Sequence, residues 1–141
     1  MNILHIDHIG IAVKSLEESI PIYERLLGTE CYALEHVKDQ FVNTAFFLVG
    51  QTKIELLEST TPDGPIGSHI ENRGEGIHHI AFAVDDTNMA LTDAKDKGFK
   101  LIDRVSRRGA EDMDIGFLNP KSCKGVLIEF CSGNPKRITH K

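Results

Sequence analysis

The sequence repeats itself, and this repeat limits the fold more than any other feature. Residues 6–13 read IDHIGIAV and residues 77–84 read IHHIAFAV. Each copy is followed by a charged, helix-like run that ends at a glycine, Gly28 in the first half and Gly98 in the second. Internal similarity of this kind indicates one fold assembled from two related units.

Each half has the same order of predicted elements: a strand, a helix and three further strands. The first helix, 15–27, begins at a capping box in which Glu18 follows Ser15 by three residues. The second helix is predicted at 86–97, and 60–67, followed by a short helix at 68–72, connects the halves. The remaining predicted strands are 31–37, 42–49, 52–58, 100–105, 114–118 and 125–131. The order predicts two βαβββ modules in an α+β fold.

Composition excludes several classes of protein. The 141 residues are 40% hydrophobic and 26% charged, which is typical of one globular domain. Sixteen Lys and Arg against 21 Asp and Glu give a net charge of -5, which argues against a nucleic-acid partner. No apolar run approaches the roughly 20 residues that cross a bilayer, and residues 1–8 do not resemble a signal peptide. We therefore expect a cytoplasmic protein with no membrane partner.

The two repeated strands each carry a histidine on a face of small residues. Side chains alternate along a strand, so His8 shares its face with Gly10 and Ala12. His79 shares its face with two alanines in the same way. A histidine surrounded by small residues suggests a cavity with a polar group at its wall.

Two glutamates occupy matching places in the last strand of each half. Glu55 lies in KIELL and Glu129 in LIEFC, each between apolar neighbours. A carboxylate in such a strand is costly to bury unless it is solvated, paired or bound to metal. His8 and His79 are 71 residues apart, and the two glutamates are 74 apart, so each half contributes one histidine and one glutamate. Two imidazoles and two carboxylates predict a site for a divalent transition metal.

These motifs resemble the vicinal oxygen chelate superfamily, and within it the methylmalonyl-CoA epimerases. The residues that carry the resemblance are DHIGIAV and KIELLE in the first half, and RGEGIHHIAFAVDD and NPKSCKGVLIEFC in the second. The resemblance implies a pseudo-two-fold axis between the modules, with eight strands in an incomplete barrel around a metal cleft. It predicts a single domain over 1–141, with module 1 at about 3–60, a connector at 61–75, module 2 at about 76–132 and a tail at 133–141.

The resemblance also implies an isomerase that interconverts (2R)- and (2S)-methylmalonyl-CoA. The metal ligands would be His8, Glu55, His79 and Glu129, with Co²⁺ favoured over Mn²⁺, Ni²⁺, Zn²⁺ or Fe²⁺. Glu129 matches a family residue assigned to proton transfer. Some epimerases place a catalytic glutamate on the second strand of the first module, but residues 39–45 here contain no glutamate. Glu55 is therefore our candidate for the second acid–base group.

An acyl-CoA substrate requires local positive charge despite the acidic balance of the chain. Lys121, Ser122 and Lys124 lie in a turn-like loop and are the predicted cofactor-binding residues, preceded by three arginines at 104, 107 and 108. Ser122 is also a candidate to bind the substrate carboxylate. The remaining histidines, His5, His36, His69, His78 and His140, are assigned to structure. We expect a homodimer, because βαβββ halves leave sheet edges to cover.

Three alternatives share the fold. A glyoxalase I-like enzyme would use the same His/Glu set for related enolate chemistry. A dioxygenase fits less well, because its iron site usually has two histidines and one carboxylate with open positions. A non-catalytic small-molecule-binding protein would bind its ligand without turnover, since fold does not determine function.

Overall fold

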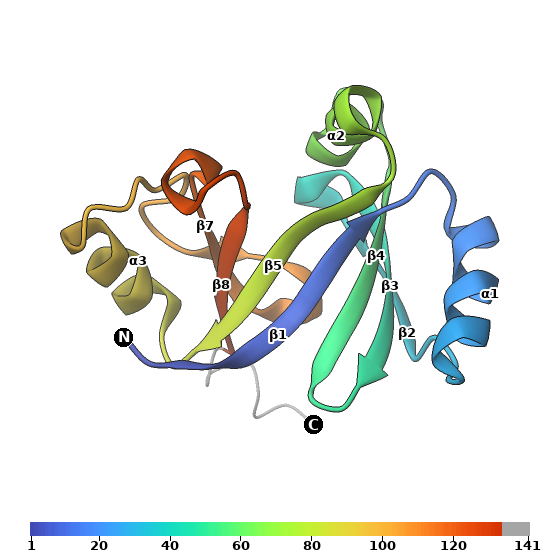
Figure 1. The fold of residues 1–141 in the computed structure, drawn as a ribbon, viewed down its shortest axis with the longest axis horizontal. Coiled ribbons are helices and arrows are strands. Elements are labelled where there is room, and N and C mark those ends of the chain that lie inside the picture. Colours follow the sequence, from blue (N-terminus) through green and yellow to red (C-terminus); the bar gives the residue numbers. More distant parts are fainter. Residues whose placement is uncertain (134–141) are drawn as a thin grey trace. The chain divides into compact units, whose positions relative to one another are not determined.

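The computed structural model describes residues 1–133 and has an α+β architecture (Figure 1). The predicted tail from 134 onward, including His140, lies outside the described residues. The chain divides into two compact units, His8–His78 and Met1–Asp7 together with the segment that begins at His79. The module bounds predicted from the sequence stay a prediction.

The two βαβββ repeats predicted from the sequence are confirmed, with a further helix between them. The strands are β1 (Ile3–Ala12), β2 (Ala33–Val37), β3 (Val42–Val49), β4 (Thr52–Ser59), β5 (Gly76–Val84), β6 (Arg107–Arg108), β7 (Asp114–Leu118) and β8 (Ile128–Ser132). The α-helices are α1 (Leu16–Leu27), α2 (Pro65–Arg73) and α3 (Thr87–Asp96). Short 3-10 turns occupy Lys38–Gln40, Ala110–Asp112 and Pro120–Cys123.

Strand pairing follows the same plan in both halves. The order is β2-β3-β4-β1 in the first half and β5-β8-β7-β6 in the second. β1 pairs in parallel with β4, and β5 pairs in parallel with β8, whereas the neighbouring pairs are antiparallel. The last strand of each half therefore lies beside the strand that carries the repeated histidine motif.

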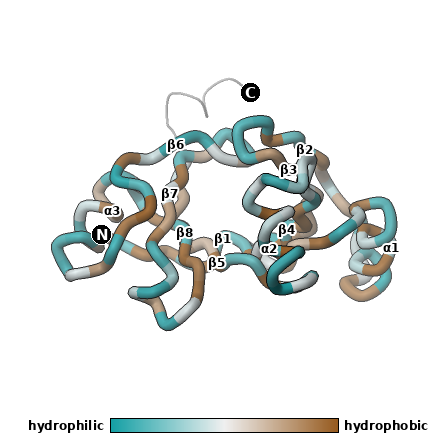
Figure 2. The backbone as a smooth tube through the Cα atoms, turned by 90° about the horizontal axis from the view of Figure 1, so that it is seen from above, coloured by the Kyte–Doolittle hydropathy of each residue, from teal (hydrophilic) through white to brown (hydrophobic). Residues whose placement is uncertain are grey.

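Each half has its own hydrophobic core beneath its helix. α1 is amphipathic, with hydrophobic and hydrophilic residues along its length (Figure 2), and it packs on β3 and β4. The core of the first half contains Val13, Leu16, Ala45, Phe47 and Leu56. The core between α3 and its sheet contains Val84, Ala90, Leu91, Ala94, Leu118 and Phe130. Burial of these side chains fixes which face of each strand is covered by helix, and the opposite face is the one that carries the histidine.

The strand predicted at 100–105 is wrong. Only Leu101 in that range forms a bridge, to Leu118, and the two-residue strand β6 comes later, at Arg107–Arg108. The carboxylate of Asp103 accepts a hydrogen bond from the backbone N–H of Phe117 at 2.8 Å, while the carbonyl of Phe117 accepts from both Ile102 and Asp103. A side chain thus takes the place of a backbone partner, and the pairing of this segment with β7 is limited to one antiparallel bridge at Leu101.

Other predicted bounds differ by a few residues. β8 begins at Ile128 and not at Gly125, because Lys124 and Gly125 both have positive φ and form a turn. β2 begins at Ala33, two residues later than predicted. α2 begins at Pro65, earlier than the predicted 68–72, because proline suits the first position of a helix.

The N-terminus of α1 depends on one side-chain hydrogen bond, which yields a stability prediction. The hydroxyl of Ser15 accepts from the backbone N–H of Glu18 at 3.2 Å. Ser15→Ala should lower the free energy of unfolding by about 1 kcal/mol, because it leaves a helix-terminal N–H without its cap. Urea unfolding measures this loss, and Ser15→Asp, which restores a capping oxygen, should recover most of it. An unchanged midpoint in Ser15→Ala would show that water replaces the cap without cost.

Candidate metal centre

The first half contains a buried histidine–glutamate pair. His8 lies on β1 and Glu55 on β4, and the imidazole Nε2 lies 3.5 Å from Oε1 of the carboxylate. Glu55 is in register with Gly10, two residues beyond His8 on the neighbouring strand. Both side chains are buried, with Glu55 only 4% exposed. The small residue at position 10 leaves room on this face for the two polar groups.

The second half contains the matching pair. The imidazole Nε2 of His79, on β5, lies 3.1 Å from Oε1 of Glu129, on β8. Glu129 is in register with Ala81, which is again two residues beyond the histidine. His79 and Glu129 are 5% and 3% exposed, so this pair is also removed from solvent.

The repeat extends to the third strand of each half. On the side away from the histidine strand, Glu55 is in register with Phe46 of β3, and Glu129 is in register with Phe117 of β7. Each glutamate therefore lies between a small residue and a phenylalanine. The same local environment occurs in both halves, and a chance contact between one histidine and one glutamate would not produce this repeat.

The chemistry of these donors fits a divalent metal ion. Burial of a carboxylate requires a partner that offsets the lost hydration, and each glutamate oxygen has an imidazole nitrogen beside it. Imidazole nitrogen and carboxylate oxygen are the ligands that Zn²⁺, Co²⁺, Mn²⁺ and Fe²⁺ commonly share in proteins. The described residues of each half thus contain one nitrogen ligand and one oxygen ligand suited to such an ion.

Aromatic and charged groups surround the pair in the second half. The ring of Phe117 makes an edge contact with the imidazole of His79, with centroids 5.7 Å apart. The guanidinium of Arg107 lies 5.4 Å from the centroid of the same phenylalanine ring. Arg107 is held by Asp103, whose Oδ1 lies 3.2 Å from Nε.

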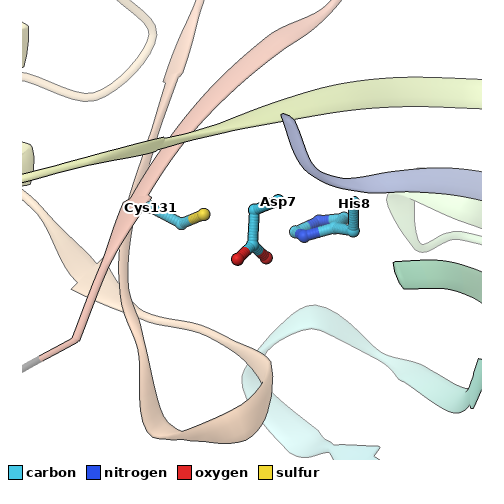
Figure 3. A group of neighbouring side chains, drawn as sticks. All are labelled: Asp7, His8 and Cys131. Carbon is cyan, nitrogen blue, oxygen red and sulfur yellow. The ribbon is translucent and has the colours of Figure 1, made fainter. Parts of the chain in front are cut away.

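A second group of potential ligands includes residues that the sequence analysis did not select. The Asp7 carboxylate and the Cys131 sulfur lie within 4.8 Å of each other, and both residues are buried. Figure 3 shows the sulfur pointing toward Asp7, which precedes His8 on β1. The sequence signal available for Cys131 was its position two residues after Glu129 on the same strand face, because side chains repeat every second residue.

Comparison with known proteins gives the family of this chain. Residues 7–117 match the Glyoxalase/Bleomycin resistance protein/Dioxygenase superfamily. The chain belongs to this superfamily. The predicted resemblance and the α+β fold with two βαβββ repeats are therefore confirmed.

Individual relatives are similar over most of their length. The uncharacterized protein YqjC of Bacillus subtilis is 42% identical over 96% of this chain and 95% of its own. The ethylmalonyl-CoA/methylmalonyl-CoA epimerase of Cereibacter sphaeroides is 34% identical over 88% of this chain and 94% of its own. A variant of Streptomyces coelicolor methylmalonyl-CoA epimerase in complex with 2-nitronate-propionyl-CoA has a TM-score of 0.91 and 34% identity, covering 95% and 97% of the two chains.

The predicted CoA-binding loop of this superfamily member is a capped 3-10 turn. The side chain of Asn119 accepts from the backbone N–H of Lys121 at 2.9 Å. The Ser122 hydroxyl accepts from the backbone N–H of Lys100 at 3.2 Å and donates to the carbonyl of Asn119 at 3.0 Å. Lys121 and Lys124 are exposed, while Ser122 is half-buried and anchors the loop. The assignment of these three residues to CoA stays a prediction.

None of the described helices is long and apolar enough to cross a membrane. The cytoplasmic location stays a prediction.

Two further histidines, which the sequence analysis assigned to structure, contact each other within the unit His8–His78. The rings of His69, on α2, and His78, on β5, make an edge contact with centroids 4.9 Å apart. Partial burial, and secondly the positive charge of Arg73, lower the pKa of His69 below its ordinary value. A lowered pKa means that the unfolded chain binds a proton more readily than the folded one.

This shift yields a prediction for the titration of His69. Folding stability contributed at His69 should fall as pH decreases through the ordinary histidine range, because protonation favours the unfolded chain. NMR titration of the His69 ring should give a pKa below that of a model histidine peptide. Arg73→Gln should raise the pKa without restoring it fully, because burial remains the larger cause. A pKa at or above the peptide value in the wild-type protein would contradict the prediction.

Proposed function

We propose that this protein is a metal-dependent methylmalonyl-CoA epimerase, an isomerase that inverts the carbon between a carboxylate and a thioester. The observation that carries the proposal is the repeated burial of a histidine–glutamate pair, in the same register in both halves. Inversion by proton transfer needs an acceptor on one face of the reacting carbon and a donor on the other. A chain that builds the same carboxylate environment twice has two such groups.

Similarity to named enzymes supports the substrate class. The relatives named as epimerases act, by their names, on methylmalonyl-CoA or ethylmalonyl-CoA, and their likeness spans most of both chains. YqjC, which is more similar in sequence, carries no named activity. The superfamily is therefore established, while the methylmalonyl-CoA specificity is our proposal.

The proposed metal ligands are His8, Glu55, His79 and Glu129, one pair from each half. Bound to these residues, a divalent ion would act as a Lewis acid that stabilises the negative charge developing on the thioester oxygen. Buried carboxylates raise the affinity for a cation, since hydration no longer competes for them. Co²⁺ is the favoured ion, with Mn²⁺, Ni²⁺, Zn²⁺ and Fe²⁺ as alternatives.

Glu129 and Glu55 are the proposed acid–base pair. One carboxylate oxygen removes the α-hydrogen, which the adjacent thioester acidifies, and the other carboxyl group delivers a proton to the opposite face. In each pair the imidazole Nε2 lies beside its carboxylate, at 3.1 Å for His79 and 3.5 Å for His8. The backbone register with Gly10 and Ala81 keeps the space beside each carboxylate clear of bulky side chains.

The acyl-CoA substrate would contact the loop that contains Lys121, Ser122 and Lys124. The two lysines are exposed and can pair with phosphate groups as mobile point charges. Because the Ser122 hydroxyl is already used twice within the protein, its proposed contribution is to hold the loop in shape. We propose a cytoplasmic homodimer as the working form.

The proposed function predicts metal-dependent exchange of the α-proton. In D₂O, the protein should remove the α-proton signal of methylmalonyl-CoA and equilibrate the two epimers, as followed by proton NMR and an epimer-specific reporter. EDTA should abolish the exchange and added Co²⁺ should restore it. Lack of exchange with every metal tested would discard the epimerase. Turnover of a glutathione hemithioacetal instead would identify a glyoxalase I-like enzyme, and tight binding without turnover would identify a binding protein.

The two-glutamate mechanism predicts distinct losses in single variants. Glu55→Gln and Glu129→Gln should each reduce epimerisation by at least about 100-fold, because the amide cannot accept the α-proton. One of them should still exchange the α-hydrogen with solvent, since the carboxylate on one face remains. Glu17→Gln, at an exposed position on α1, is the matched control and should retain full activity. Full activity in Glu55→Gln would remove Glu55 from the mechanism.

A further inference from the structure

We propose that Arg107 binds the free carboxylate of the acyl group and so selects malonyl-type thioesters over neutral acyl-CoA. This inference rests on the proposed function and identifies the group that would recognise the acid end of its substrate. The residues that support it, His79, Asp103, Arg107, Phe117 and Glu129, all belong to the second half of the chain.

Arg107 is connected to the histidine–glutamate pair by a single phenylalanine. Its guanidinium lies 5.4 Å from the ring centroid of Phe117, and that ring makes an edge contact with His79. Phe117 is also in backbone register with Glu129. The cation is therefore placed next to the ring that adjoins both members of the buried pair, and a cation–π contact of this kind orients the guanidinium.

Asp103 fixes the orientation of Arg107. Oδ1 of Asp103 lies 3.2 Å from Nε of the arginine, and Oδ2 accepts from the backbone N–H of Phe117 at 2.8 Å. Because both carboxylate oxygens are engaged, this aspartate is itself anchored to β7. The contact with Asp103 uses Nε, and the guanidinium has further N–H donors on its two terminal nitrogens. A planar pair of N–H donors matches a carboxylate in bidentate geometry.

The other arginines of this segment are placed differently. Arg108 follows Arg107 on β6, so its side chain leaves the strand on the opposite face. It pairs with Asp112, with Nε 3.0 Å from Oδ1, within the β6–β7 connection. β6, which consists of Arg107 and Arg108, is hydrophilic (Figure 2). Arg107 alone, of the two, contacts the ring that adjoins His79.

The first half has no cation in the corresponding place among its described contacts. Its phenylalanine, Phe46, is contacted by the ring of Tyr32, with centroids 5.9 Å apart. By register, the residue that corresponds to Arg107 is Glu35 on β2: Glu35 pairs with Thr44, two residues before Phe46, and Arg107 pairs with Ile115, two residues before Phe117. The two halves therefore carry opposite charges at this position. An asymmetric substrate, with a thioester at one end and a carboxylate at the other, needs such an asymmetry to bind in one orientation.

A positive charge at Arg107 would offset the negative charge that develops during the reaction. Removal of the α-proton from a malonyl thioester builds negative charge next to an existing carboxylate and beside Glu129. A guanidinium offsets that repulsion and remains charged at any pH at which the protein is folded. Neutral acyl-CoA molecules have no carboxylate, so they would add no second ion pair to the one that Arg107 makes with Asp103.

Binding measurements with two substrate analogues test the proposal. Isothermal titration calorimetry with malonyl-CoA and propionyl-CoA should show that the wild-type protein binds malonyl-CoA more tightly, by about tenfold or more, because the ion pair has no counterpart in propionyl-CoA. Arg107→Gln should remove most of this preference by weakening malonyl-CoA binding, with propionyl-CoA affinity nearly unchanged. Arg107→Lys should recover part of it, since charge is kept but the planar fork is lost.

Arg108→Gln is the matched control, since it removes the adjacent charge from the same short strand. It should keep the preference for malonyl-CoA, whereas Asp103→Asn, which loosens a positioning residue, should reduce that preference less than Arg107→Gln does. Circular dichroism establishes that each variant is folded. An unchanged ratio of the two affinities in folded Arg107→Gln would overturn the proposal, as would a wild-type protein without the preference.

The exchange assay separates this inference from the proposed function. If the wild-type protein exchanges the α-proton of methylmalonyl-CoA and Arg107→Gln keeps the malonyl-CoA preference, the epimerase stands and the role of Arg107 fails. If the wild-type protein shows the preference but no exchange with any metal, the carboxylate site stands and the epimerase fails. A raised KM for methylmalonyl-CoA with little change in kcat in Arg107→Gln would place the effect in substrate binding.

Discussion

A carboxylate in the middle of a buried strand is the constraint on which this structure depends. Glu55 and Glu129 lose their hydration when β4 and β8 pack into their sheets, and that loss must be offset by a nearby polar partner. In each half the partner comes from the adjacent parallel strand, two residues before the position in register with the glutamate. The parallel pairing of first and last strands, the small residues between them and the helix on the opposite face are all compatible with this arrangement, and a shift of one residue would disrupt it.

Much of the fold could be predicted from the sequence, because each element predicted in one half can be checked against the matching segment of the other half. A helix after each IDHIGIAV-like strand was predicted from the capping box at Ser15 and from the glycines at 28 and 98. In the structure Ser15 and Asp86 both accept a hydrogen bond from the N–H three residues later. The failure at 100–105 has a physical cause that periodicity cannot show. There, Asp103 uses its side chain to pair with the backbone of β7, so a stretch of strand-like composition turns away from the sheet edge. Turn residues with positive φ at 124 and 125 similarly delay β8.

The four candidate residues of the site could be predicted from the sequence, but the contacts around them could not. The similar offsets of 71 and 74 residues identified His8, His79, Glu55 and Glu129, and in the structure each half has one histidine beside one glutamate. Whether the two pairs share one metal ion stays a prediction. The contacts around them depend on neighbours that are close only after folding. Arg107, Phe117 and Asp103 are separated by four to fourteen residues in sequence, and no spacing rule places a guanidinium on a ring that adjoins a histidine.

The two halves differ in the groups that contact their phenylalanines. Repetition supplies two similar carboxylate environments, and a proton can be exchanged on either face of a carbon only if both are retained. A perfectly symmetric pair of environments would bind a malonyl thioester in two orientations, one of which places the thioester oxygen away from the stabilising charge. Arg107 in one half, and Glu35 at the corresponding register position in the other, would remove that ambiguity. On this view the arginine acts in substrate binding, because it favours the productive orientation of a malonyl thioester over the reversed one.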